Sequence, residues 1–346
     1  MARLVVVLLG KAPFTFCGSL ATRHLRQHTA DISLRMACAN KAVSTSHSFA
    51  ASSRVYRRPV RAVRGRTRAE ASSMHFDAGI PLEGLPWGVE GSREVESRTF
   101  SYRDGDIALE AYMAWDAAKV AAEGPRPGVL VAHTAIGMQE YFITSCCQSL
   151  ARLGYTAMAL DLFGAGQCVF DKEVRNGILQ PLRDDRRRLA KRVQAAYDAL
   201  VNESSVVKET SGVAAVGFCL GGQAVLDLAR ANTAKELRGV VSFHGVLDHP
   251  SIFTKSGEGK PPNALILHGE SDPFTDEDKL RECLDGLTSL GMTWDLHVYS
   301  GAKHAFTRPE KTTDEDFDSG FQYDARAATQ SWSSCKTFLE SVIEKS

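Results

Sequence analysis

The feature that most constrains the fold is a series of short apolar runs, each followed by a segment with helical periodicity. Most of the runs are unbroken stretches of Val, Ile, Leu and Ala, without the alternation of a strand that has one face in water. They lie at residues 128–133, 155–164, 213–218, 239–245, 263–270 and 293–301. Strands of this kind are buried on both faces, so the sequence predicts a doubly wound, mostly parallel sheet with helices on both faces.

Apolar residues at helical spacing fill the segments between these runs. Helices are predicted at about residues 139–153, 184–201, 220–231, 276–290 and 324–342. A hairpin is predicted over 98–116, around Asp104-Gly105. The chain from residue 75 to residue 346 is therefore expected to form one α/β domain.

Residues 1–74 have a different composition from the rest of the chain. They hold 13 Lys or Arg against Asp31 and Glu70, a balance of +11, so the remainder carries −11 because the whole chain sums to zero. An Arg-rich, Ser-rich and acid-poor segment is typical of an organelle transit peptide. We therefore predict a transit peptide or a disordered arm here, with a location in the mitochondrion or plastid, and otherwise in the cytoplasm.

Two other readings of this basic segment remain. A basic arm for nucleic acid is disfavoured, because interleaved aromatics and a binding-fold signature are missing, and no nucleic-acid partner is expected. The other reading is that translation starts at Met74, so that the basic segment is not part of the true chain. No run of eighteen apolar residues exists, so no membrane-spanning helix is expected.

Cys219 has the most distinctive surroundings of the eight cysteines. None of the eight forms a C-x-x-C pair, so zinc and thioredoxin-like sites have no support and no metal site is expected. Cys219 is the centre of GFCLGG, between the run at 213–218 and the helix from Leu220. Such a turn lifts its central side chain above the sheet, and the helix N-terminus favours a thiolate. Cys219 is predicted to be a nucleophile, and the alternative is a small buried residue.

A thiol nucleophile needs a base and an acid to orient that base. On this fold the chain order is nucleophile, then acid, then histidine, with each residue in a loop after a strand. Asp272 follows the run at 263–270, and His304 follows the run at 293–301. Both are therefore predicted to act with Cys219. The rival acids and histidines are Asp248, Asp276, Asp278, His244, His268 and His297.

The motifs GFCLGG, LHGESDPF and GAKHAFTR together resemble the dienelactone hydrolase family, over residues 95–346. The resemblance implies an α/β-hydrolase fold and a triad of Cys219, Asp272 and His304. It further implies cofactor-free hydrolysis of enol-lactones through a thioester. The backbone amides of Leu220 and Ala135 would bind the oxyanion.

The resemblance also suggests residues for the substrate site. Arg308, four residues after His304, matches an arginine that binds the substrate carboxylate in the family. A second such arginine would be Arg183 or Arg175. Thr134, also assigned to this site, stands where the family carries a glutamate that switches the cysteine between thiol and thiolate. Without it, His304 would deprotonate Cys219 directly, or the helix terminus would hold the thiolate. The absence of this glutamate removes the specific support for dienelactone as the substrate.

The sequence therefore predicts a hydrolase of a small lactone or ester, with neither a nucleic acid nor a membrane as partner. A thioesterase or acyltransferase uses the same intermediate and stays open. Two non-catalytic alternatives are a small-ligand sensor on this fold and a redox-responsive thiol. Pocket shape is expected to depend on loops such as residues 163–182.

Overall fold

The computed structural model describes residues 85–88, 94–255 and 259–343. The predicted transit peptide, residues 1–74, lies outside the described residues, so that assignment stays a prediction. None of the helices in the described ranges combines the length and apolar character needed to cross a membrane.

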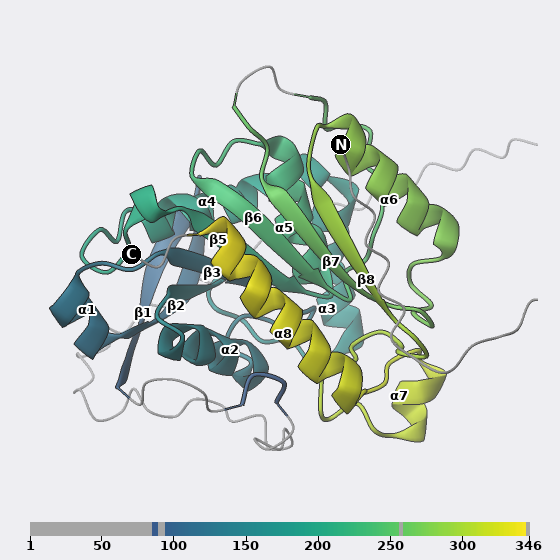
Figure 1. Cartoon of the computed structure of the whole chain (residues 1–346). Helices are drawn as coiled ribbons and strands as arrows, with labels where there is room; N and C mark the ends of the chain where they lie inside the picture. Colours follow the sequence, from purple (N-terminus) through teal and green to yellow (C-terminus); the bar gives the residue numbers. More distant parts are fainter. Residues whose placement is uncertain (1–84, 89–93, 256–258, 344–346) are drawn as a thin grey trace, which may run out of the picture. The chain divides into compact units, whose positions relative to one another are not determined.

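Eight strands form one sheet in the order β1-β2-β4-β3-β5-β6-β7-β8 (Figure 1). Their bounds are β1 Val95–Asp104, β2 Ile107–Asp116, β3 Gly128–Ala132, β4 Thr156–Leu160, β5 Val213–Phe218, β6 Leu237–Phe243, β7 Asn263–Gly269 and β8 Trp294–Tyr299. The pairs β1–β2 and β2–β4 are antiparallel, and every other pair is parallel. The mostly parallel sheet predicted from the apolar runs is confirmed.

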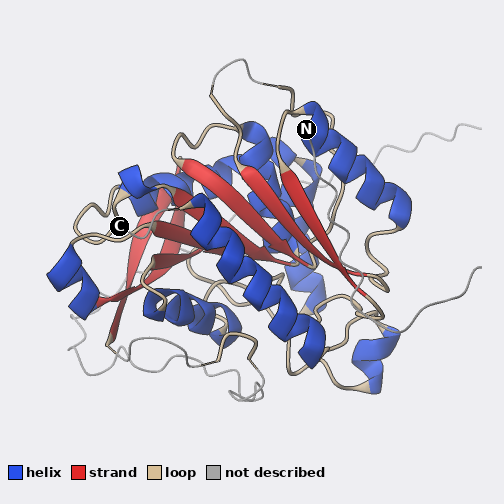
Figure 2. Cartoon of the chain, viewed as in Figure 1, coloured by secondary structure: helices blue, strands red, loops and turns tan. Residues whose placement is uncertain are grey.

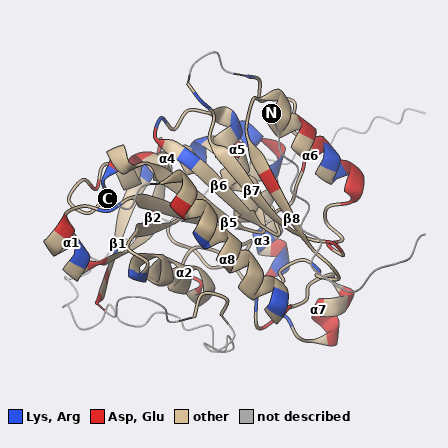
Figure 3. Ribbon diagram, in the orientation of Figure 1, with Lys and Arg blue, Asp and Glu red and all other residues tan. Residues whose placement is uncertain are grey.

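Helices cover both faces of the sheet, as predicted. Their bounds are α1 Ala117–Glu123, α2 Tyr141–Arg152, α3 Lys172–Asp184, α4 Arg186–Val201, α5 Leu220–Ala231, α6 Glu277–Ser289, α7 Asp314–Asp318 and α8 Ala325–Val342. Helices α2 and α8 pack in one apolar layer, in front of the sheet in Figure 2, while α4, α5 and α6 pack in the other. The parallel strands carry few charged side chains, which gather instead on helices such as α6 and α7 (Figure 3).

Helix α3 differs from the sequence prediction, which treated residues 163–182 as loop. Asp171 caps this helix by accepting a hydrogen bond of 2.8 Å from the amide of Val174. Leu179 and Leu182 bury its inner face. Pro181 lies inside the last turn of α3, and α4 then begins afresh after its own cap, Asp185. Tertiary burial of the two leucines therefore overrides the breaker signals of Gly177 and Pro181.

Trp87 packs the start of the described chain against the rest of the domain. Its side chain is only 2% exposed. Its ring lies 4.8 Å from Phe142 of α2, 5.9 Å from Phe218 of β5 and 5.5 Å from Trp332 of α8, measured between centroids. Its indole N–H donates to the hydroxyl of Ser145 at 3.2 Å. One side chain thus ties two helices to a central strand.

Replacing Trp87 with alanine should lower the free energy of unfolding by about 3–5 kcal/mol, because it empties a fully buried aromatic site. Urea denaturation followed by circular dichroism measures the loss. Phe170, with 58% of its side chain exposed, supplies the control, and Phe170→Ala should change stability by no more than about 0.5 kcal/mol. Equal stability of the two variants would show that Trp87 does not anchor the domain.

Candidate active site

Cys219 lies at a sharp turn between β5 and α5, as the sequence predicts. Its backbone adopts φ 54° and ψ −114°, a left-handed conformation that is strained for a residue with a side chain. Glycines make the turn possible, because a Cβ on Gly217 would lie 2.1 Å from the carbonyl oxygen of Gly221. A Cβ on Gly221 would lie 2.2 Å from the carbonyl oxygen of Ala132, at the end of β3. The partly exposed Cys219 thiol therefore stands above the ends of these strands.

His304 and Asp272 lie beside this thiol. His304 Nδ1 is 2.7 Å from Asp272 Oδ2, and the His304 ring also hydrogen-bonds the thiol of Cys219. The other carboxylate oxygen of Asp272 accepts a hydrogen bond of 2.9 Å from the amide of Phe274. Asp272 and His304 are both buried, at 5% and 1% exposure. The structure thus brings the three predicted side chains into one hydrogen-bonded chain.

The electrostatics of the site favour a thiolate beside an imidazolium. Burial opposes ionisation of Cys219, but the charge of His304 and hydrogen bonds from His304 and the Leu220 amide lower the pKa of the thiol below its usual value. Burial likewise disfavours the charged form of His304, yet the neighbouring Cys219 and Asp272 raise its pKa to about 10. The positive charge of Arg183 also lowers the pKa of the Cys219 thiol.

Two backbone amides were predicted to bind an oxyanion. Leu220 is the first residue of α5, where an amide has no carbonyl within its own helix. Ala135 lies in the loop after β3, and hydrogen bonds hold its neighbours Thr134 and Ile136. The amide of Ile136 donates to the hydroxyl of Thr134 at 3.1 Å, and the amide of Val169 donates to the carbonyl of Ile136 at 2.7 Å.

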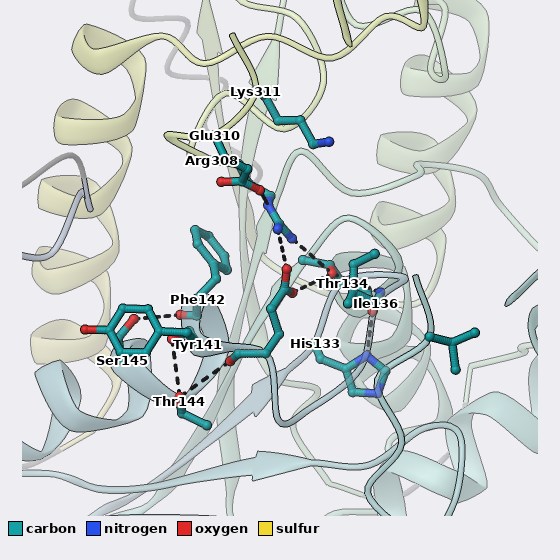
Figure 4. A network of polar contacts seen from close by, with 12 residues as sticks. His133, Thr134, Ile136, Tyr141, Phe142, Thr144, Ser145, Arg308, Glu310 and Lys311 are labelled. Carbon is teal, nitrogen blue, oxygen red and sulfur yellow. Dashed lines mark hydrogen bonds and ion pairs between the residues drawn. The ribbon is translucent and has the colours of Figure 1, made fainter. Parts of the chain in front are cut away.

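A buried network of polar side chains lies behind the same loop (Figure 4). The hydroxyl of Thr134 donates to a carboxylate oxygen of Glu140 at 3.0 Å, and the guanidinium of Arg308 pairs with the other oxygen. Arg308 also pairs with Glu310 and donates to the Thr134 hydroxyl at 3.3 Å. The ring of Phe142 lies 5.0 Å from the Arg308 guanidinium carbon. The side chain of Glu140 is fully buried.

Glu140 is a residue of this network that the sequence analysis does not assign. Position 134 holds no carboxylate of its own, but the Thr134 hydroxyl bonds the carboxylate of Glu140. Sequence reasoning missed Glu140, because an acid at the start of a helix is ordinary. Here it is the N-cap residue of α2, and its side chain makes no cap hydrogen bond because it bonds Thr134 and Arg308 instead. Burial raises the pKa of Glu140, and the charge of Arg308 acts against this.

The predicted substrate-binding residues differ in their freedom to bind. Arg308 is buried among protein partners, so a substrate carboxylate would have to replace Glu140 or Glu310. Arg183 is exposed in the last turn of α3, with its charge acting on Cys219. Arg175, the alternative to Arg183, donates to the backbone carbonyls of Val169 and Phe170.

The rival residues take other positions. Asp248 pairs with Arg186, and Asp276 caps α6, whose first turn also holds Asp278. His297 pairs with Ser334. His244 lies beside His304, at 5.2 Å between ring centroids, and bonds the Thr307 hydroxyl at 2.8 Å. Burial lowers the pKa of His244 and of His268, so both rings stay neutral around His304. Across the described ranges no cluster of three His, Cys, Asp or Glu residues is placed to hold a metal.

Comparisons with known proteins identify the family and the fold of this chain. Residues 109–343 match the dienelactone hydrolase family. A protein of Bradyrhizobium sp. named "Probable 2-oxo-3-(5-oxofuran-2-ylidene)propanoate lactonase" is 28% identical over 204 residues, which cover 55% of this chain and 77% of that protein. A solved dienelactone hydrolase-like promiscuous phosphotriesterase from metagenomic libraries is 30% identical with a TM-score of 0.64, over 72% of this chain and 100% of that one.

A more distant structure shares the fold alone. The acylaminoacyl peptidase of Pyrococcus horikoshii is 14% identical, with a TM-score of 0.54 over 74% of this chain and 43% of that one. The α/β-hydrolase fold expected from the sequence motifs is confirmed by these neighbours and by the strand order.

The Cys219 thiol should react with iodoacetamide at a pH below the value of about 8.5 that is usual for a free thiol. Arg183→Gln should move the midpoint of this pH profile upward, because a nearby cation favours the thiolate. Arg175→Gln, on the same helix, is the matched control and should leave the midpoint unchanged. Alkylation is followed by mass spectrometry of the Cys219 peptide. A wild-type midpoint at or above that of a free thiol would contradict the assignment.

Glu140→Gln should destabilise the protein by about 3 kcal/mol, because it removes the fully buried partner of a buried cation. Glu310→Gln is the matched control, since its carboxylate is 20% exposed, and it should cost about 1 kcal/mol. Chemical denaturation of both variants measures the difference. Equal losses would show that Glu140 has no special part in holding Arg308.

Proposed function

The chain belongs to the dienelactone hydrolase family, and we propose that it hydrolyses small lactones or carboxylic esters through a thioester on Cys219. The observation that carries the proposal is the hydrogen-bonded chain from Cys219 to His304 to Asp272, with the thiol at the start of α5. A nucleophile, a base and an acid that orients the base are the parts that acyl transfer needs.

In the first half of the reaction, the Cys219 thiolate attacks the ester carbonyl and forms the C–S bond. The negative charge moves to the carbonyl oxygen, which the amides of Leu220 and Ala135 stabilise. The C–O bond then breaks, and the departing oxygen takes the proton from the imidazolium of His304. In a lactone this oxygen stays attached to the acyl chain, so the product remains tethered to Cys219.

In the second half, neutral His304 removes a proton from water, and the hydroxide attacks the thioester carbonyl. Collapse of this intermediate expels the Cys219 thiolate and releases the acid. The proton on His304 again faces a thiolate, so the resting ion pair is restored. Asp272 holds the ring through Nδ1 during both halves, which keeps the other nitrogen directed at the reacting atoms.

The network of Glu140, Thr134 and Arg308 has a supporting part in this proposal. It fixes the loop that carries Ala135, because the Thr134 hydroxyl is bonded to Glu140, to Arg308 and to the amide of Ile136. A stable loop keeps the oxyanion donor in place before the charge develops. Arg183 is the exposed cation beside Cys219, so it is the residue proposed to meet an anionic group of the substrate.

One relative supports this class of substrate, because the Bradyrhizobium protein is named as a lactonase. The metagenomic protein is named as a promiscuous phosphotriesterase, which is a different class of ester. A thioesterase or acyltransferase would pass through the same thioester, and product analysis with water or an added alcohol as acceptor separates these activities.

Cys219→Ala should lower kcat/KM for 4-nitrophenyl acetate and for a small lactone by a factor of about 1,000 or more, because the covalent step is lost. Asp272→Asn should lower it by a similar factor through misorientation of His304. Intact-mass spectrometry after rapid acid quench should detect an acetyl group on the wild type and none on Cys219→Ala.

Cys168 is the matched control, because it is also partly exposed, and Cys168→Ala should keep both the activity and the acyl adduct. Hydrolysis that survives in Cys219→Ala would overturn the proposed function. Absence of turnover on a panel of esters and lactones would favour the ligand-binding alternative instead.

A further inference from the structure

Two phenylalanine rings pack against His304. Phe274 lies 4.8 Å from the His304 ring between centroids, with an interplanar angle of 76°, and Phe321 lies 5.6 Å away at 71°. The two phenylalanines contact each other at 5.3 Å. Both therefore present their rings to the residue that handles protons in the proposed reaction.

Phe274 is the more open of the two rings. Its side chain is 38% exposed, so the ring is open to a ligand as well as to solvent. Phe321 is half-buried, with the ammonium group of Lys311 lying 5.6 Å from its centroid. His244, the remaining ring beside His304, is fully buried. Of the rings that contact His304, Phe274 is therefore the most open to an incoming ligand.

The backbone around Phe274 is rigid. Its amide donates to Asp272 at 2.9 Å. The preceding Pro273 packs against Gly320 so closely that a Cβ on this glycine would lie 2.4 Å from Pro273 Cγ. The loop that positions the acid therefore also positions the backbone of Phe274, so a ligand that stacks on its ring needs little ordering of this loop.

The proposed proton transfer determines which part of a substrate lies beside Phe274. The imidazolium must give its proton to the departing oxygen, so that oxygen lies within hydrogen-bond distance of His304. The group attached to that oxygen must then lie next to His304, where Phe274 is the exposed ring. The acyl part lies on the other side of the carbonyl, toward Cys219 and the two amides.

We propose that Phe274 forms a subsite for the leaving group, and that the enzyme prefers esters whose leaving alcohol carries a planar aromatic ring. This inference rests on the proposed function, because it requires His304 to protonate a leaving oxygen. Edge-to-face and offset-stacked ring pairs supply both affinity and orientation.

The test compares two acetate esters whose primary alcohols have similar acidity, benzyl acetate and 2-methoxyethyl acetate. Phe274→Ala should lower kcat/KM for benzyl acetate about tenfold, the loss expected for one aromatic contact and the apolar area that it buries. It should leave 2-methoxyethyl acetate within about twofold of the wild type. Phe170→Ala is the matched control and should change neither ester.

Two outcomes of this comparison overturn the inference. An equal loss for both esters would show that Phe274 merely supports His304, and no loss for either would show that no subsite exists. Failure of the wild type to hydrolyse any ester, with Cys219→Ala indistinguishable from it, would instead mark failure of the proposed function.

A binding measurement tests the subsite without turnover. Benzyl alcohol should slow the alkylation of Cys219 by iodoacetamide in the wild type, because it occupies the space beside His304. Protection should weaken about tenfold in Phe274→Ala, and 2-methoxyethanol should protect neither protein. Equal protection of both proteins by benzyl alcohol would overturn the subsite even if ester hydrolysis is observed.

Discussion

The whole site depends on the close approach of the β5–α5 turn to the end of β3. Backbone atoms of Gly217, Gly221 and Ala132 lie so close together that no Cβ fits between them. This contact forces Cys219 into a left-handed conformation, a strain of order 1–3 kcal/mol that the surrounding sheet must offset. In return the thiol lies at the N-terminus of α5, where backbone amides and the helix dipole stabilise negative charge. The strained backbone of Cys219 and the reactivity proposed for its thiol therefore have one origin.

The buried charges around this thiol are paired with opposite charges or suppressed by burial. The His304 imidazolium balances the thiolate, while burial holds His244 and His268 neutral. A second cationic ring beside His304 would weaken its ability to keep a proton. On the other side of the loop, Glu140 and Glu310 neutralise the buried Arg308. The arrangement leaves one mobile proton near the reacting atoms, which suits a reaction that moves one proton in each half.

Local patterns in the sequence predicted much of this arrangement. The Gly-x-Cys-x-Gly spacing marks the turn, and the ends of buried strands mark Asp272 and His304, because parallel strands deliver their following loops to one edge of the sheet. Glu140 escaped prediction since its partner Arg308 is 168 residues away. Helix α3 escaped because its stability comes from the burial of Leu179 and Leu182, which outweighs the local cost of Gly177 and Pro181.

The contacts of Trp87 have a consequence for how the chain can be shortened. Trp87 contacts Phe218, and Phe218 is the residue directly before Cys219. A chain that begins at Leu85 keeps this contact, whereas one that begins after Trp87 loses the packing against the neighbour of Cys219. Any shortened form of the chain therefore has to keep Trp87 if the packing beneath the β5–α5 turn is to be preserved.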